Sequence, residues 1–286
     1  MKTLYHYCST PTFYALLEAR AIWLSSLTSS NDYMEGKLVS QAITRLARSE
    51  GLSVEDISMM QDSLALMEIV SDGLGFCLSE DGDLLSQWRG YAADGMGVSI
   101  GFHKDFLQRI ADTNSAADGP GVQLAKVQYD PSAHDILVRP TYEEMKRLLS
   151  SPEWRQRQPA SLGAATAVTS AASSDAALRT TMQIMQAPLI LLQKVFLLKA
   201  PGFLEEKEWR LLTHSVPTLG TAPRYRPAIT RLVPFKSYAF LEDESRPIAE
   251  VILGPKHQTP ALVVKQCLAH MGFGEVAVLE SRTSYR

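Results

Sequence analysis

The sequence is poor in cysteine, and no cysteine or histidine pair has the spacing of a metal site. Three cysteines occur in 286 residues, Cys8, Cys77 and Cys267, and none of them forms a Cys-x-x-Cys motif. Structural zinc sites are built from such closely spaced pairs. An odd number of scattered cysteines is typical of reduced thiols in a cytosolic protein. The sequence therefore predicts neither a zinc site nor a disulfide framework.

Long apolar runs are also missing. The longest one, Ala187–Ala200, is interrupted by Pro188, Gln193, Lys194 and Lys199. It is too short and too charged to span a bilayer. The first ten residues, MKTLYHYCST, lack the apolar segment of a secretory signal. We therefore expect a cytoplasmic protein without a membrane partner.

The sequence has no excess of positive charge. It contains 28 Lys and Arg against 31 Asp and Glu, for a formal net charge of −3. This balance argues against a scaffold with a dedicated basic face for nucleic acid, but not against an enzyme that meets nucleic acid through one local basic groove. The GxSxG, Walker and HExxH motifs are absent as well. Gly95-Met96-Gly97 lacks the third glycine of a dinucleotide-binding fingerprint.

Apolar periodicity and turn residues predict strands near both ends of the chain, with most helices between them. The expected strands are residues 4–9, 21–25, 75–79, 97–102, 122–129, 206–212, 248–253 and 275–280. The expected helices are residues 11–20, 37–48, 54–71, 142–149, 176–198 and 258–271, and the helix at 176–198 is expected to kink or restart at Pro188. Because strands and helices do not alternate regularly, the pattern favours an α+β fold over a doubly wound sheet.

We interpret residues 1–286 as a single domain with a helical or flexible insertion at about 131–200. Residues 161–177 within this insertion are almost entirely Ala, Ser and Thr. Such a composition fits either a mobile linker or a helix of small residues, and it does not decide between them.

The acidic segment EEKEWR, residues 205–210, is the first candidate site. On a strand, Glu206, Glu208 and Arg210 share a face, which places the two carboxylates about 6.6 Å apart along the backbone. Two carboxylates at that range can divide labour in catalysis, with one orienting a nucleophile and the other holding a sugar hydroxyl. The alternative is a solvated strand face with Arg210 as its counter-ion.

A second candidate is the segment LSQWRGY, in which Trp88, Arg89 and Tyr91 offer flat rings and a forked donor for a ligand with phosphates. Alternatively, Trp88 and Tyr91 are core residues of one helical turn. A third candidate combines Tyr5, His6 and Tyr7 of the first expected strand with three later side chains. Those are Ser25 and the pair Asn31-Asp32, which follow the second expected strand. Taken alone, these residues suit structural roles, since Asn and Asp are common helix caps.

In order, the segments LYHYCS, IWLSSLTSSNDYMEG, FCLSEDGDLLSQWRGYA, GVSIGF, EEKEWRLL and ESRTSYR resemble a large bacterial family of unknown function. The resemblance extends from Leu4 to Arg286. That family in turn resembles the ADP-ribosyltransferase superfamily, particularly the branch of toxins that modify DNA. It implies a split β-sheet core, NAD as the substrate and no metal. The implied acceptor is a nucleic acid or a protein, and the implied setting is a toxin or a phage-defence effector.

The resemblance also implies residue roles. His6 matches a first-strand position that binds the adenosine ribose and the nicotinamide end, with Tyr7 beside it. Glu208 matches the catalytic glutamate, and Glu206 stands two residues earlier. The remaining implied NAD contacts are Ser79 or Tyr91 against the nicotinamide with Trp88, Arg89 at the pyrophosphate or ribose, and Ser25 and Asn31 along the cleft.

Two alternatives stay open. One is a non-enzymatic module on the same fold that binds a nucleotide or a phage component. The other is a hydrolase, such as a glycosidase or nuclease, that uses Glu206 and Glu208 as an acid/base pair. The predicted spacing of these carboxylates lies near the window of about 6.5–9.5 Å for inverting glycosidases.

Overall fold

The computed structural model describes residues 2–28, 34, 36–70, 72–115, 121–155, 171–215, 223–228, 230–240 and 246–285. The chain forms two compact units. The sheet unit contains Met1–Asn31, Gly73–Val127 and Gly202–Arg286, and the helical unit contains Asp32–Asp72 and Gln128–Pro201. In these described parts, no helix has both the length and the apolar character needed to cross a membrane.

The sheet unit contains the strands of the molecule and a few short helices. Its strands are β1 (Thr3–Cys8), β2 (Ala21–Ser26), β3 (Asp72–Ser79), β4 (Val98–His103), β5 (Gln123–Lys126), β6 (Glu208–Ser215), β7 (Arg224–Pro227), β8 (Leu232–Ala239), β9 (Ile248–Leu253) and β10 (Ala277–Glu280). Its helices are α1 (Thr10–Ala19), α4 (Leu85–Tyr91), α5 (Lys104–Thr113), α10 (Ala261–His270) and the 3₁₀ helix η2 (Pro201–Glu206).

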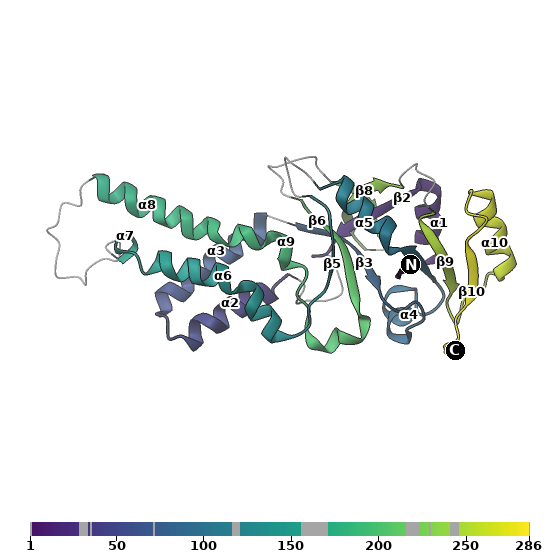
Figure 1. Ribbon diagram of the computed structural model, residues 1–286, viewed down its shortest axis with the longest axis horizontal. Helices are drawn as coiled ribbons and strands as arrows, with labels where there is room; N and C mark the ends of the chain where they lie inside the picture. The colour runs from purple at the N-terminus through teal and green to yellow at the C-terminus, as the bar shows by residue number, and fades with distance from the viewer. Residues whose placement is uncertain are drawn as a thin grey trace. The chain divides into compact units, whose positions relative to one another are not determined.

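The strands form one sheet that branches at β3. The main path runs β10-β9-β4-β1-β3-β2-β8-β7, while β6 pairs with both β3 and β5. Near its ends β3 pairs with β1 at Ser79 and with β2 at Leu74 and Gly75. Because a strand has only two edges, three partners on β3 require that two of them share one edge. The branch brings β1, β2 and β6 to a single strand, β3, which Figure 1 labels together with β2 and β6.

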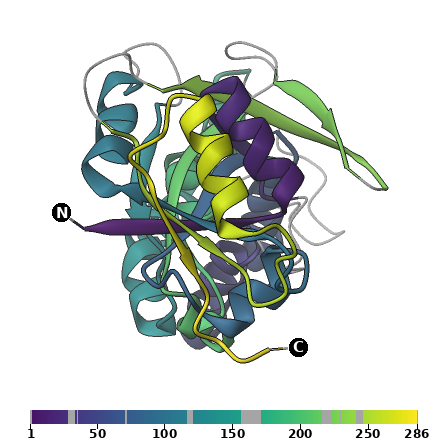
Figure 2. The same cartoon turned by 90° about the vertical axis from the view of Figure 1, so that its right-hand side faces the viewer.

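Helices α1 and α10 lie side by side against the sheet, as Figure 2 shows. Helix α1 begins with Ser9, whose hydroxyl accepts a hydrogen bond from the amide of Thr12, and it ends at Arg20 in a left-handed conformation. Ser9 is thus the N-cap. Phe13, Leu16 and Leu17 of α1 join Val264 and Leu268 of α10 in the main hydrophobic core, since each helix turns its apolar face toward the sheet.

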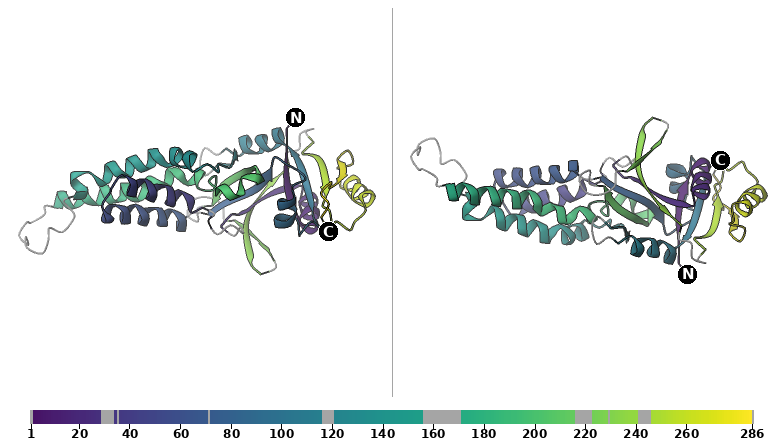
Figure 3. Two further views of the ribbon diagram at one scale, coloured as in Figure 1. Left: turned by 90° about the horizontal axis from the view of Figure 1, so that it is seen from below. Right: turned by 90° about the horizontal axis from the view of Figure 1, so that it is seen from above.

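The helical unit consists of α2 (Leu38–Ser49), α3 (Val54–Val70), α6 (Pro131–Leu149), α7 (Pro152–Arg155), α8 (Ala171–Gln186), η1 (Ala187–Leu191) and α9 (Leu192–Val195). Figure 3 shows the four longer helices, α2, α3, α6 and α8, packed along one another. Helix α6 begins well before the predicted residue 142, because Asp130 caps it and Pro131 suits the first turn.

The helix expected for residues 176–198, kinked or restarted at Pro188, is interrupted at that point. Helix α8 ends at Gln186, and Pro188 lies at the start of η1, where the missing amide of proline interrupts the α-helical hydrogen bonds. Residues 171–177 of the Ala/Ser/Thr stretch belong to α8, and the remainder of that stretch lies outside the described residues. At the level of class, the mixed architecture confirms the α+β prediction.

Candidate functional site

The two candidate carboxylates do not sit on one strand. Glu206 ends η2, β6 begins at Glu208, and Lys207 between them has a positive φ of 46°. A lysine in this left-handed region is uncommon, because its Cβ crowds the backbone. The prediction of a strand from residue 206 to 212 is therefore wrong at its start, because the strand begins only at Glu208. The turn at Lys207 gives Glu206 and Glu208 different surroundings.

Glu208 is held in a buried ion pair. Arg210 donates from Nε to Oε1 of Glu208 at 2.7 Å and from Nη2 to Oε2 at 3.0 Å. Arg210 is 1% exposed and Glu208 is 5% exposed. The two residues do share a strand face, as alternate residues of β6 must. This bidentate pairing matches the predicted counter-ion role of Arg210, although the pair lies in the interior and not on a solvated face.

Glu206 meets side chains from two other segments. The hydroxyl of Tyr91, at the end of α4, donates to Oε1 of Glu206 at 3.1 Å. The hydroxyl of Ser79, at the end of β3, donates to the backbone carbonyl of Glu206 at 2.7 Å. Tyr91 is 42% exposed, whereas Glu206 and Ser79 are buried. The structure thus joins Ser79, Tyr91 and Glu206, which are well separated in the sequence, into one cluster.

His6 is fixed on β1 as a neutral imidazole. Its Nδ1 lies 2.8 Å from the carbonyl oxygen of Cys77, and its ring stacks on Phe76 with the ring centres 3.9 Å apart. Burial lowers the pKa of His6 to about 4, against the opposing hydrogen bond to Cys77 and with help from the charge of Arg226. A carbonyl accepts only, so Nδ1 carries the proton and Nε2 remains a hydrogen-bond acceptor.

Arg226 on β7 joins this part of the sheet unit. Its Nη2 donates to the hydroxyl of Ser25 on β2 at 3.2 Å, and its Nε is buried without a hydrogen-bond partner. Burial, aided by the nearby Arg231, lowers the pKa of the Arg226 guanidinium. Among the residues that the structure describes, no carboxylate forms an ion pair with Arg226. The only sequence signal for it is the short basic stretch RYR in a hairpin that periodicity did not predict.

Strand β3 links these two groups of side chains. His6 contacts the carbonyl of Cys77, and Ser79 lies two residues further along the same strand. The register pairs Tyr5 with Ser79, so the His6 ring lies on the opposite face of β3, against Phe76, and the two groups are neighbours along the strand and not on one face. We call the combined set, His6, Ser25, Ser79, Tyr91, Glu206 and Arg226, the β3 cluster.

Trp88 and Tyr7 support this region from the core. Trp88 is fully buried and packs edge-on against Tyr7, with the ring centres 4.9 Å apart. The hydroxyl of Tyr7 donates to the carbonyl of Asp81 and accepts from the amide of Leu84. Burial raises the pKa of Tyr7. This placement favours the core interpretation of Trp88 and gives Tyr7 a structural role, so neither ring offers a free face to a ligand.

Asp83 ties α4 to the C-terminal segment. Its carboxylate accepts from Nε1 of Trp88 at 2.7 Å, from the amide of Arg282 at 2.7 Å and from the hydroxyls of Ser281 and Thr283. Burial alone raises the pKa of Asp83, but these hydrogen bonds, that of Ser281 foremost, hold it below the usual value. Through Asp83, residues 281–283 of the segment ESRTSYR thereby help to position α4, the helix that carries Tyr91.

The other predicted site residues do not join the cluster. Arg89 is exposed and lies over the ring of Tyr285, 5.8 Å from its centre. Asn31 lies outside the described residues. Within those residues, no three side chains of His, Cys, Asp or Glu are grouped to hold a metal ion.

Residues 87–211 match the model of a family described as a protein of unknown function, DUF2971. Over this span the match supports the resemblance to a domain-of-unknown-function family that the motifs predict. The match includes Tyr91, Glu206 and Glu208, whereas His6, Ser25 and Arg226 lie outside it. No curated protein and no solved structure matches the chain.

Proposed function

We propose that this protein is an NAD-dependent mono-ADP-ribosyltransferase-like enzyme with an ADP-ribosyltransferase-like split sheet. The observation that carries the proposal is the convergence of Ser79, Tyr91 and Glu206 from three separate segments, with His6 of β1 bonded to the carbonyl of Cys77 on β3. The sheet that branches at β3 also supports it.

The proposed chemistry assigns the reacting carboxylate to Glu206. When the bond between nicotinamide and ribose breaks, nicotinamide leaves with the bonding electron pair, and positive charge develops on the ribose. A fixed carboxylate stabilises that charge most strongly in the transition state. Glu206 suits this role better than Glu208, because Arg210 engages both oxygens of Glu208. The acceptor then attacks C1 of the ribose and releases its proton to Glu206 or to solvent.

The remaining members of the β3 cluster suit the rest of a dinucleotide. The neutral Nε2 of His6 can accept a hydrogen bond from a ribose hydroxyl. The guanidinium of Arg226 offers a forked donor to a pyrophosphate, and its buried Nε has no partner of its own. Tyr91, which is 42% exposed, can pack against a flat ring while its hydroxyl orients Glu206. The acceptor belongs to the class of nucleic acids or proteins.

The test is to measure NAD binding by titration calorimetry alongside nicotinamide release by the same preparation. We expect both binding and slow release, with release increased by the correct acceptor. The proposal is contradicted if the protein, at millimolar NAD, shows no binding of NAD and no release of nicotinamide.

A binding module without catalysis is the second candidate. The neutralisation of Glu208 by Arg210 favours it, because that carboxylate, the predicted catalytic one, is already satisfied. Binding of NAD without any release of nicotinamide supports this candidate. The same ion pair counts against a hydrolase that uses Glu206 and Glu208 together, since such an enzyme needs both carboxyl groups to exchange protons.

A further inference from the structure

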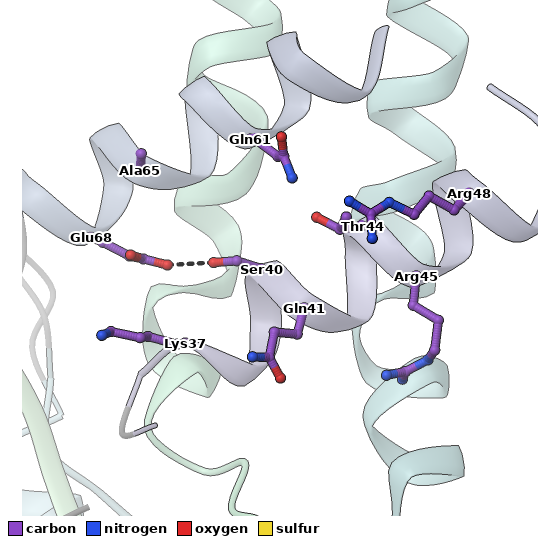
Figure 4. A pocket seen from close by; sticks show the side chains of 9 residues that line it. All are labelled: Lys37, Ser40, Gln41, Thr44, Arg45, Arg48, Gln61, Ala65 and Glu68. Carbon is purple, nitrogen blue, oxygen red and sulfur yellow. Dashed lines mark hydrogen bonds between the residues drawn. The ribbon is translucent and has the colours of Figure 1, made fainter. Parts of the chain in front are cut away.

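A groove lined mainly by residues with polar or charged end groups runs between α2 and α3 in the helical unit. It has a volume of about 590 Å³, and Figure 4 shows the side chains that line it. The lining residues are Lys37, Ser40, Gln41, Thr44, Arg45, Arg48, Gln61, Ala65 and Glu68. They follow one face of each helix, since they recur at intervals of three or four residues. The groove lies entirely within one compact unit.

The charge of this groove is one-sided along α2. Residues 37–49 contain Lys37, Arg45 and Arg48 and no aspartate or glutamate. The one acidic lining residue, Glu68 of α3, accepts a hydrogen bond from the hydroxyl of Ser40 (Figure 4). Arg45 forms an ion pair with Asp135 of α6. Arg48 is exposed and makes no ion pair within the described part of the chain. The groove therefore presents cationic groups, with Arg48 available to a ligand.

We propose that this groove binds the phosphate groups of a nucleic-acid strand. Lys37 and Arg48 are 11 residues apart on α2 and its N-cap, a span of about 16 Å at about 1.5 Å per residue. That span corresponds to roughly five phosphates of a duplex strand at about 3.4 Å each. A single free phosphate is too small to contact both Lys37 and Arg48 across this span. The amides of Gln41 and Gln61 and the hydroxyl of Thr44 add uncharged donors.

The same lining argues against an acidic peptide as the occupant. Protein interfaces are centred on buried aromatic and large aliphatic anchors, and Ala65 is the one apolar side chain among the lining residues that the structure describes. Interfaces with nucleic acid are more polar and more positive. Because no aromatic ring is among the described residues that line the groove, we expect contacts to the sugar-phosphate backbone and not to the bases. The formal net charge of −3 does not oppose this local binding.

The inference stands apart from the carboxylate chemistry, because no residue is shared between the groove and the β3 cluster. The test is fluorescence anisotropy of the full chain with a labelled DNA duplex, in a salt series from low to physiological concentration. We expect the logarithm of the observed binding constant to fall linearly with the logarithm of the salt concentration. Arg48→Gln weakens binding several-fold and reduces the magnitude of the slope by about 0.9, which corresponds to one lost phosphate contact.

Arg147→Gln is the matched control. Arg147 is an exposed arginine of α6 in the same unit, outside the groove, and pairs with Glu144. Its loss changes the net charge equally and leaves the slope unchanged. Equal effects of the two variants, or no binding at low salt, overturn the proposal. Displacement of the duplex by equal charge concentrations of polyglutamate or of inorganic phosphate also overturns it, because either result marks a general anion patch. Circular dichroism of both variants verifies the fold.

Discussion

Arg210 occupies both carboxylate oxygens of Glu208, at 2.7 and 3.0 Å, with both side chains almost completely buried. Removing one partner of such a pair leaves an uncompensated charge in the interior, which costs about 3–5 kcal/mol. We therefore expect Glu208→Gln to lower the free energy of unfolding by that amount, measured by urea denaturation. The double variant Glu208→Leu/Arg210→Met recovers much of the loss. A change below about 1 kcal/mol in the single variant contradicts this reading of the pair.

The stability of the sheet unit depends on pH through two histidines. Burial lowers the pKa of His6 to about 4, and burial together with Lys236 lowers the pKa of His214 to about 4. The unfolded chain, with histidine pKa values of about 6.5, binds more protons between those limits. Stability is therefore complete above about pH 6.5, is lost as the pH falls toward 4, and changes little below that through these groups.

The measurement is the free energy of unfolding from urea curves at several pH values between 4 and 7.5. Each histidine contributes a slope of up to about 1.4 kcal/mol per pH unit. His6→Gln should flatten the curve in this window, whereas His270→Gln, at an exposed position of α10, serves as the control. Identical curves for wild type and His6→Gln argue that His6 is not buried as a neutral group.

A third prediction concerns the contribution of Arg226 to NAD binding. We expect Arg226→Gln to weaken NAD binding about tenfold, equivalent to about 1.4 kcal/mol, because a charged hydrogen bond to phosphate is lost. The melting temperature should hardly change, since the Arg226 side chain makes only one hydrogen bond within the described residues, to Ser25. Arg224→Gln, at an exposed position two residues earlier on β7, is the matched control. Equal affinities of the two variants remove Arg226 from the site.

A further prediction concerns Asp83, which positions α4 and the C-terminal segment. Asp83→Ala leaves the buried Nε1 of Trp88 without its acceptor and releases Ser281 and Thr283. We expect a loss of about 1–3 kcal/mol in the free energy of unfolding and faster proteolysis of residues 281–285. Because α4 also carries Tyr91, the maximal rate of nicotinamide release should fall more than the affinity for NAD. Glu280→Ala, an exposed neighbour on β10, should alter none of these properties.

Local patterns predicted the elements better than they predicted the site. The strand at residues 21–25 and the helix at 37–48 lie within about one residue of β2 and α2, because alternation and helical periodicity there are strong. The hairpin β7–β8 and helix α5 were missed, although α5 is amphipathic. The left-handed turn at Lys207 was also invisible, since no residue type marked it.

The sequence predicted some of the site residues and missed others, because their positions depend on tertiary packing. Whether an aromatic residue is buried depends on tertiary packing, so the sequence did not separate the buried Trp88 from Tyr91, which is 42% exposed. The convergence of Tyr91 with Glu206 depends on how β3, α4 and η2 meet, and no local pattern encodes that meeting. Arg226 escaped notice because it approaches Ser25 only through the pairing of β7 with β8 and of β8 with β2.

The most direct measurement of the central claim compares nicotinamide release by Glu206→Gln and Glu205→Gln. The two variants make the same chemical change at adjacent residues, one buried against Tyr91 and the other exposed. If the Glu206 carboxylate stabilises the transition state, Glu206→Gln lowers the rate by about 10²–10³ while NAD still binds, and Glu205→Gln retains the wild-type rate. Full turnover of NAD by a folded Glu206→Gln variant contradicts the account.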